Sequence, residues 1–140
     1  MAVAVTIDTA VAVDPSQGID KTQSGLLVSG SLTLTGSYGA GSPVTDGDII
    51  DWTKTLKRAG ALLTSDLPPR WVFIYQEPTA GNAPIVYIFL YARGTKRDNG
   101  RLIVQDGTLA SIAPGAYPAA LTNTDTPPNI RYLASFPLFL

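Results

Sequence analysis

Apolar and polar residues alternate most clearly between Leu26 and Tyr38. The even positions are apolar apart from the glycines at 30 and 36, whereas the odd positions carry mostly serine and threonine. An alternation of period two is typical of a β-strand with one buried face and one face toward water. Residues 39–43 are rich in glycine and proline, which favour a chain reversal. The pattern therefore predicts a long strand over residues 26–38.

The amino-terminal residues show a second alternation. Between residues 2 and 13, Val3, Val5 and Ile7 share one face, and threonine, aspartate and alanine occupy the other. The segment 14–18 then contains Asp, Pro and Gly, a composition that favours a turn. We expect an N-terminal strand or extended arm over residues 1–25, followed by a β-sandwich over residues 26–140, with the whole chain forming a single domain.

Two segments, 71–75 and 85–91, are apolar or aromatic at nearly every position. Strands that are covered on both faces have such sequences, so we expect both segments to be central strands of a two-layer β structure. Residues 93–100, which follow the second of these segments, are rich in charge, and we expect them to form the tip of a hairpin. Further strands are expected at 102–104, at 117–121 and from Ile130 onward.

Helical spacing is confined to one region. Ile49, Trp52 and Leu56 could share one face of a helix, and Gly60 could end it. The sequence therefore predicts an all-β fold, an antiparallel β-sandwich or jelly roll of seven or eight strands, with at most one short helix near residues 48–59.

The composition limits the chemistry that the chain can carry. Its 140 residues suffice for one domain with a core of its own. The chain has no cysteine, no histidine and a single glutamate, Glu77. It therefore lacks thiolate and imidazole ligands, and it lacks the commonest general base near neutral pH. We expect no enzymatic activity, no cofactor and no metal.

One carboxylate cluster deserves a comparison with metal sites. Asp46, Asp48 and Asp51 lie close together in the sequence, and hard cations prefer clustered carboxylates. However, Ile49 and Ile50 stand where a calcium-binding loop needs further oxygen ligands. Roles in turns and in helix capping are therefore favoured for these aspartates.

Charge is distributed unevenly along the chain, although the net charge is only −1. Residues 1–51 contain six aspartates and one lysine, whereas residues 52–101 contain eight lysines and arginines against three acidic residues. This asymmetry suits the packing of complementary surfaces between subunits. The small net charge argues against nucleic acid as the main partner. The basic residues that we expect at an interface are Lys54, Lys57, Arg58 and Arg97.

Both ends of the chain are apolar, and the last five residues read Phe-Pro-Leu-Phe-Leu. Large apolar side chains that are not needed in the core are typical of contacts with another subunit. The expected interface therefore also includes Val3, Val5, Ile7, Phe136, Leu138, Phe139 and Leu140. The longest apolar run, 85–92, is far shorter than the roughly 20 residues that span a bilayer, so we expect no membrane association.

Several segments, taken in order, resemble one group of proteins. These are Gly30-Ser-Leu-Thr-Leu-Thr-Gly-Ser-Tyr38, the turn with Asp46-Gly-Asp48, the aromatic segments 71–75 and 85–91, Gly100-Arg-Leu-Ile-Val104, and Ile130-Arg-Tyr-Leu-Ala-Ser-Phe136. The chain resembles small β proteins that are encoded near the major capsid protein of tailed bacteriophages and that decorate or cement the phage head. The resemblance covers most of residues 26–136 and rests on the order and spacing of strands.

The resemblance implies a structural role without catalysis. It implies that copies of the chain, commonly trimers, bind the outer surface of the capsid, bridge subunits of the major capsid protein and stabilise the head. The N-terminus lacks the basic region that precedes the apolar core of a signal peptide, so we expect the protein to be made in the host cytoplasm. The resemblance implies that it ends in the virion, on the outer surface of the capsid. The alternative is a carbohydrate- or receptor-binding β-sandwich of a phage tail or fibre, for which Trp52 or Trp71 would supply an exposed aromatic platform.

Overall fold

A computed structural model describes residues 3–13, 25–39, 47–53, 67–77, 87–122 and 129–137. Within these ranges the chain forms nine strands and the short helix α2. Their bounds are β1 (Val3–Val13), β2 (Gly25–Leu34), β3 (Ser37–Tyr38), β4 (Asp48–Ile50), β5 (Trp71–Gln76), β6 (Ile88–Ala92), β7 (Gly100–Gln105), β8 (Gly115–Ala116), α2 (Ala119–Thr122) and β9 (Ile130–Pro137). None of the helices in these ranges is long and apolar enough to cross a membrane.

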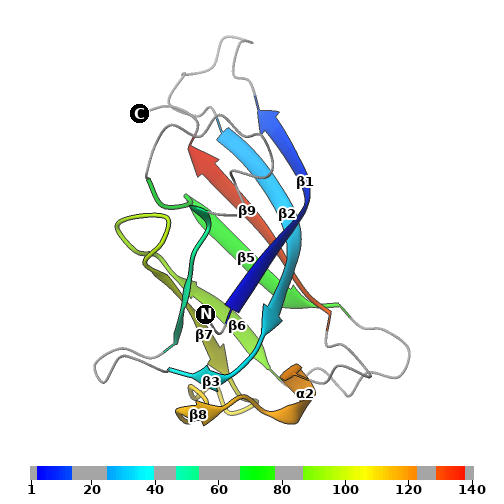
Figure 1. Ribbon diagram of the computed structural model, residues 1–140, viewed down its shortest axis with the longest axis vertical. Helices are drawn as coiled ribbons and strands as arrows, with labels where there is room; N and C mark the ends of the chain where they lie inside the picture. Colours follow the sequence, from blue (N-terminus) through cyan, green and yellow to red (C-terminus); the bar gives the residue numbers. More distant parts are fainter. Residues whose placement is uncertain are drawn as a thin grey trace.

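The strands form a β-sandwich-like structure of antiparallel sheets, which confirms the predicted fold class. The four-stranded sheet has the order β1-β2-β9-β5, and the three-stranded sheet has the order β4-β7-β6. Strands β3 and β8 form a small third pair near α2 (Figure 1). The sheets approach each other along two seams, where β5 lies beside β6 and β1 lies near β4.

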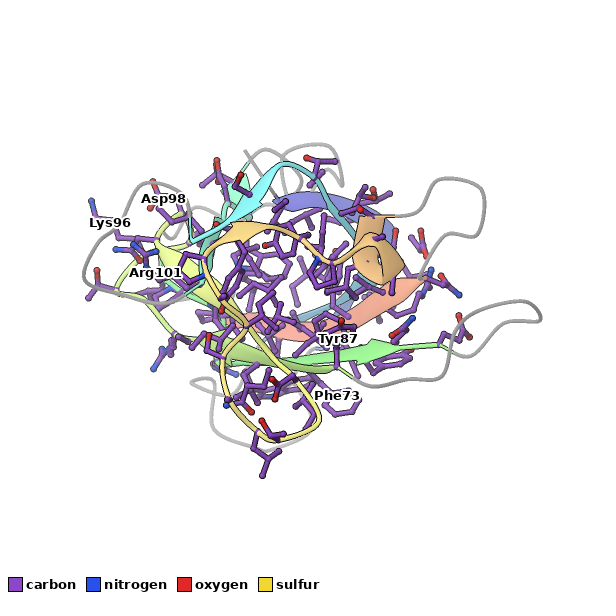
Figure 2. The ribbon with its side chains drawn as sticks, turned by 90° about the horizontal axis from the view of Figure 1, so that it is seen from below. Phe73, Tyr87, Lys96, Asp98 and Arg101 are labelled. Atoms are coloured by element: carbon purple, nitrogen blue, oxygen red, sulfur yellow. The ribbon has the colours of Figure 1, made fainter. Side chains whose placement is uncertain are left out.

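The core lies between the two larger sheets, where side chains from both fill the space (Figure 2). Trp52 is at its centre and is fully buried. The indole makes edge-to-face contacts with three rings, at centroid distances of 6.1 Å to Tyr91, 5.1 Å to Tyr132 and 5.5 Å to Phe136. Aromatic rings favour this geometry because the positive edge of one meets the negative face of the other.

The alternation that begins at Leu26 is confirmed, but the strand is shorter than expected. The apolar even positions of β2 are buried, and the polar odd positions are partly or fully exposed. The strand ends at Leu34 because Gly36 adopts a positive φ of 74°, a conformation that residues with a Cβ rarely take. After this turn, Tyr38 belongs to β3 in a different sheet, although its side chain is still buried.

Two other local expectations need correction. The segment 117–121, expected as a strand, contains the beginning of α2, and the strand β8 precedes it at Gly115–Ala116. A short helix was expected near 48–59, but its first three residues, Asp48–Ile50, form strand β4 and pair with β7. Thr53 is helical, and residues 54–59 lie outside the described ranges.

The N-terminal segment is a strand of the main sheet. β1 pairs with β2 from Val3 to Val13, with a bulge between Ile7 and Thr9. The hairpin expected at residues 93–100 is also present, since β6 and β7 pair on either side of it, with Ala92 opposite Arg101.

The expectation of double-sided burial for the segments 71–75 and 85–91 is wrong for the residues that are described. β5 is the last strand of the four-stranded sheet, and β6 is the last strand of the three-stranded sheet. Each strand covers the core with one face only. Its other face is exposed to solvent, and this face carries the candidate functional site.

Candidate functional site

Five large apolar side chains on β5 and β6 are exposed on the outside of the sandwich. The exposed fractions are 47% for Trp71, 60% for Phe73, 40% for Tyr75, 41% for Ile88 and 43% for Leu90. We call these five residues the apolar face. Soluble monomers seldom expose a contiguous apolar patch of this kind without a function for it.

The period of the strands explains how the apolar face arises. Trp71, Phe73 and Tyr75 alternate along β5 with Val72 and Ile74, which pack toward the core. Figure 2 shows the ring of Phe73 on the outer side of its strand, away from the side chains that fill the core. The rings of Phe73 and Tyr75 stack at a centroid distance of 5.5 Å. On β6, Ile88 and Leu90 alternate in the same way with the buried Phe89.

An open groove of about 700 Å³ runs along these two strands. Its lining is formed by Val72, Phe73, Ile74, Tyr75, Gln76, Tyr87, Ile88, Phe89, Leu90, Tyr91, Ala92 and Ile103. Polar side-chain atoms in this lining come only from Gln76 and from tyrosine hydroxyls. The groove therefore offers apolar contact area and stacking surfaces, and its lining lacks the paired acid and base groups that hydrolytic chemistry requires.

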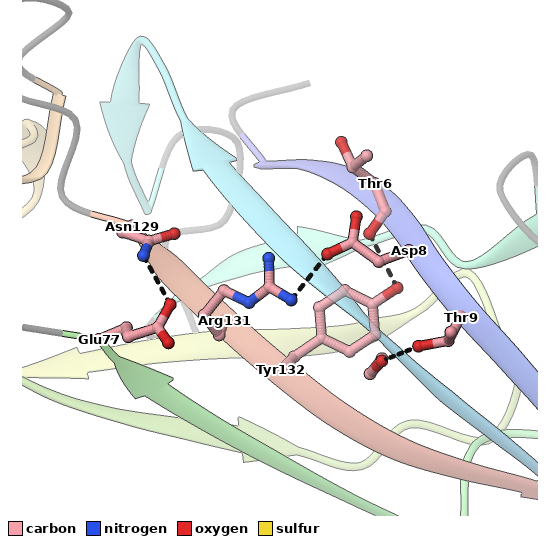
Figure 3. A network of polar contacts seen from close by, with 8 residues as sticks. Thr6, Asp8, Thr9, Glu77, Asn129, Arg131 and Tyr132 are labelled. Carbon is pink, nitrogen blue, oxygen red and sulfur yellow. Dashed lines mark hydrogen bonds and ion pairs between the residues drawn. The ribbon is translucent and has the colours of Figure 1, made fainter.

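A polar network covers the outer face of the four-stranded sheet beside the apolar face (Figure 3). Arg131 on β9 forms an ion pair of 2.7 Å with Asp8, which is the extra residue of the β1 bulge. Hydrogen bonding to Asp8 raises the pKa of the Arg131 guanidinium. Asn129 donates to the Glu77 carboxylate at 2.7 Å. These contacts tie β1, β9 and the end of β5 together, which is a structural role.

The aspartates of the predicted carboxylate cluster have separate structural tasks. Asp48 is buried and accepts hydrogen bonds from the Gly39 backbone N–H, at 2.9 Å, and from the Tyr117 hydroxyl. Asp51 accepts from the Thr53 backbone N–H at 2.9 Å, which is a turn or capping contact. Asp46 lies outside the described residues. Among the residues that are described, no group of three acidic side chains could hold a metal ion.

Three arginines bind backbone carbonyls of neighbouring segments. Arg93 donates to Pro69, Arg97 to Leu67 and Arg101 to Gly47, at 3.1, 3.1 and 3.0 Å between nitrogen and oxygen. Arg97 is only 5% exposed, so it fastens the 93–99 hairpin to the segment before β5 and offers little surface to a partner. Lys54, Lys57 and Arg58 lie outside the described residues.

The apolar ends contribute to the core. Val3 and Phe136 are buried, and Val5 and Ile7 pack against the core as partly buried side chains. Burial inside the chain leaves Val3 and Phe136 without surface for a partner. Leu138, Phe139 and Leu140 lie outside the described residues.

The sequence pattern does not reveal the apolar face, because its runs of apolar residues predict core positions. A segment that is apolar at every position fits a central strand, but it fits equally well an edge strand with one face in the core and one face in an interface. The sequence contains no signal that separates these two cases.

Comparisons with known proteins add no relationship. No protein-family model matches the chain, and no curated protein and no solved structure matches it either.

Proposed function

We propose that the chain is a structural virion protein, a decoration or cement protein that binds the outer surface of a tailed-phage capsid and bridges subunits of its major capsid protein. The observation that carries the proposal is the apolar face on β5 and β6, a surface of several large side chains held outward by two rigid strands. Such a surface requires a macromolecular partner. The resemblance in strand order and spacing implies two kinds of partner, further copies of the chain and the major capsid protein.

The polar groups discussed above have structural roles within the chain, which fits a protein that binds a partner without catalysis. Asp48, Tyr117 and the arginines of the 93–101 region are used in contacts within the chain. A cement protein requires no reactive groups, because it acts by holding neighbouring subunits together. Repeated copies on one lattice gain avidity even where each single contact is modest.

Sugar binding is the second candidate, because the aromatic residues of the apolar face are exposed. Trp52 is fully buried, so of the two tryptophans only Trp71 is available for a platform. Sugar sites combine such rings with polar groups that bind the hydroxyls. Here the rings are flanked by Ile88, Leu90 and Ile103, and this apolar surrounding favours a protein surface as the partner.

Cosedimentation with phage heads tests the proposed function. Heads are assembled from the major capsid protein that the resemblance implies is encoded beside this chain. They are mixed with the purified protein and pelleted, and the decorated particles are imaged by electron microscopy. We expect density at regular positions on the outer surface and an increased rupture temperature of the heads. Absence from the pellet together with binding on a glycan array, lost in a Trp71→Ala variant, would favour the second candidate instead.

A further inference from the structure

The apolar face has a charge difference between its two ends. Arg93 donates to the Pro69 carbonyl, which places it beside the start of β5, next to Arg70. Arg101 lies opposite Ala92, the last residue of β6, but its guanidinium donates to the Gly47 carbonyl beside β4, away from the apolar face. We call Arg70 and Arg93 the basic end. The charged residues of the neighbouring hairpin, Lys96 and Asp98, are of opposite sign (Figure 2).

The other end of the apolar face is acidic. Glu77 directly follows β5 and is exposed. Asp106 directly follows Gln105, which lies opposite Ile88 at the start of β6. Hydrogen bonds from Thr108 lower the pKa of Asp106 and favour its charged form. We call Glu77 and Asp106 the acidic end; the nearby Arg131 forms an ion pair with Asp8 and is also attracted by Glu77.

The size of the apolar face suits half of a symmetric interface. Five half-exposed large side chains present on the order of 500 Å² of apolar surface. A standard interface buries about 800 Å² on each partner, of which the apolar part forms the centre and charged groups form the rim. The apolar face with its two charged ends has this arrangement.

We propose that the apolar face binds the same face of a second copy of this chain, in an antiparallel two-fold arrangement that brings the basic end of each copy to the acidic end of the other. A two-fold axis through the centre of the patch, near Phe73 and Leu90, makes every contact occur twice. The antiparallel direction is selected because the parallel one would oppose like charges at both ends. The inference rests on the proposed function in that it assigns the apolar face to contacts between copies of the chain, which leaves the capsid to other surfaces. It gives a two-fold pair where the resemblance implies, commonly, trimers.

Sedimentation velocity over a concentration series tests the pairing. We expect the wild-type chain to form a dimer. Phe73→Glu should raise the dimer dissociation constant by about 30-fold or more, because it buries a charge at the centre of the interface. The control is Val11→Glu, which introduces the same charge at an exposed valine on β1, away from the apolar face. This control variant should dimerise as the wild type does.

A charge exchange tests the antiparallel direction. Arg93→Glu alone should weaken the dimer by about 10-fold, since it places like charges across the interface. The double variant Arg93→Glu with Glu77→Arg should restore the dissociation constant to within about 3-fold of the wild type. Circular dichroism of each variant establishes that it is folded.

Three results would overturn the inference: a wild-type chain that stays monomeric at high concentration, an oligomer that Phe73→Glu leaves intact, or a charge exchange that fails to restore pairing. These results are separable from failure of the proposed function. A monomeric chain that still decorates heads removes only the pairing, whereas a dimer that binds no head removes only the capsid role.

Discussion

Gly30 on β2 and Tyr132 on β9 lie opposite each other, and the missing side chain of Gly30 gives the tyrosine a path across the sheet. The Tyr132 hydroxyl donates to the backbone carbonyl of Thr6 on β1 at 3.1 Å (Figure 3). The carbonyl lies beside the bulge between Ile7 and Thr9. One side chain of β9 therefore joins three strands of the four-stranded sheet.

Replacing Gly30 by alanine should destabilise the chain strongly. A Cβ at this position would lie 1.8 Å from the Thr6 carbonyl oxygen and 2.9 Å from the Tyr132 hydroxyl, so the backbone of β1 must move. We expect a loss of about 3 kcal/mol in the free energy of unfolding, measured by urea denaturation. The matched control is Gly107→Ala, since no atom lies within 4 Å of a Cβ there. Equal stability of the two variants would contradict this account of Gly30.

The buried carboxylate of Asp48 predicts a second stability effect. It accepts from the Gly39 N–H and from the Tyr117 hydroxyl, so it connects β4 with the β3 and β8 pair. Asp48→Ala leaves the buried Tyr117 hydroxyl and the partly buried Gly39 N–H without their acceptor and should cost about 2–3 kcal/mol. The exposed Asp98 is the control, and Asp98→Ala should change stability by no more than about 0.5 kcal/mol.

A double-mutant cycle separates the Asp48–Tyr117 contact from other effects of the substitution. Tyr117→Phe removes the hydroxyl that donates to Asp48 and keeps the ring that packs edge-to-face on Tyr38 at 5.6 Å. We expect Tyr117→Phe and Asp48→Ala together to cost less than the sum of the two single losses. Strict additivity would indicate that the two side chains do not depend on each other.

The fold class could be predicted from the sequence because its signal is local. The period of two in β2 and β9 determines which residues face the core, and this alternation is found in the structure. The boundaries of the strands and of α2 are harder to predict from the sequence. Gly36 ends β2 through its backbone conformation, and the α2 segment depends on its position after β8 rather than on a repeating pattern.

The candidate site could not be predicted, because it depends on the order of strands in the sheets. Nothing in the sequence of residues 71–75 indicates that, among the strands that the structure describes, β5 pairs with β9 alone. The same is true of β6, which is the last described strand of its sheet. The same applies to Arg97 and Phe136. Their residue types fit a binding surface, but their burial follows from contacts with Leu67 and Trp52, which are distant in the chain.

Stability should fall at alkaline pH. Burial and the neighbouring Asp48 raise the pKa of Tyr117, and burial raises that of Tyr132. Above about pH 10 a tyrosine in the unfolded chain loses its proton, whereas these two keep theirs in the native state. Unfolding then releases protons, and each tyrosine lowers the free energy of unfolding by about 1.4 kcal/mol per pH unit. Urea midpoints at pH 8, 10 and 11 measure the slope, which should be smaller in Tyr117→Phe. Equal slopes in this variant and the wild type would contradict the prediction.

The two tryptophans should differ in fluorescence, because Trp52 is fully buried and Trp71 is 47% exposed. In a Trp71→Phe variant the remaining emission comes from Trp52 and should be blue-shifted and hardly quenched by acrylamide, since its indole is enclosed by Tyr91, Tyr132 and Phe136. The wild-type spectrum minus that of the variant isolates Trp71, which should be red-shifted and readily quenched in the monomer. If the apolar face pairs between copies, the quenching of Trp71 should decrease as the protein concentration rises. A red-shifted, readily quenched spectrum for the Trp71→Phe variant would contradict the buried position of Trp52.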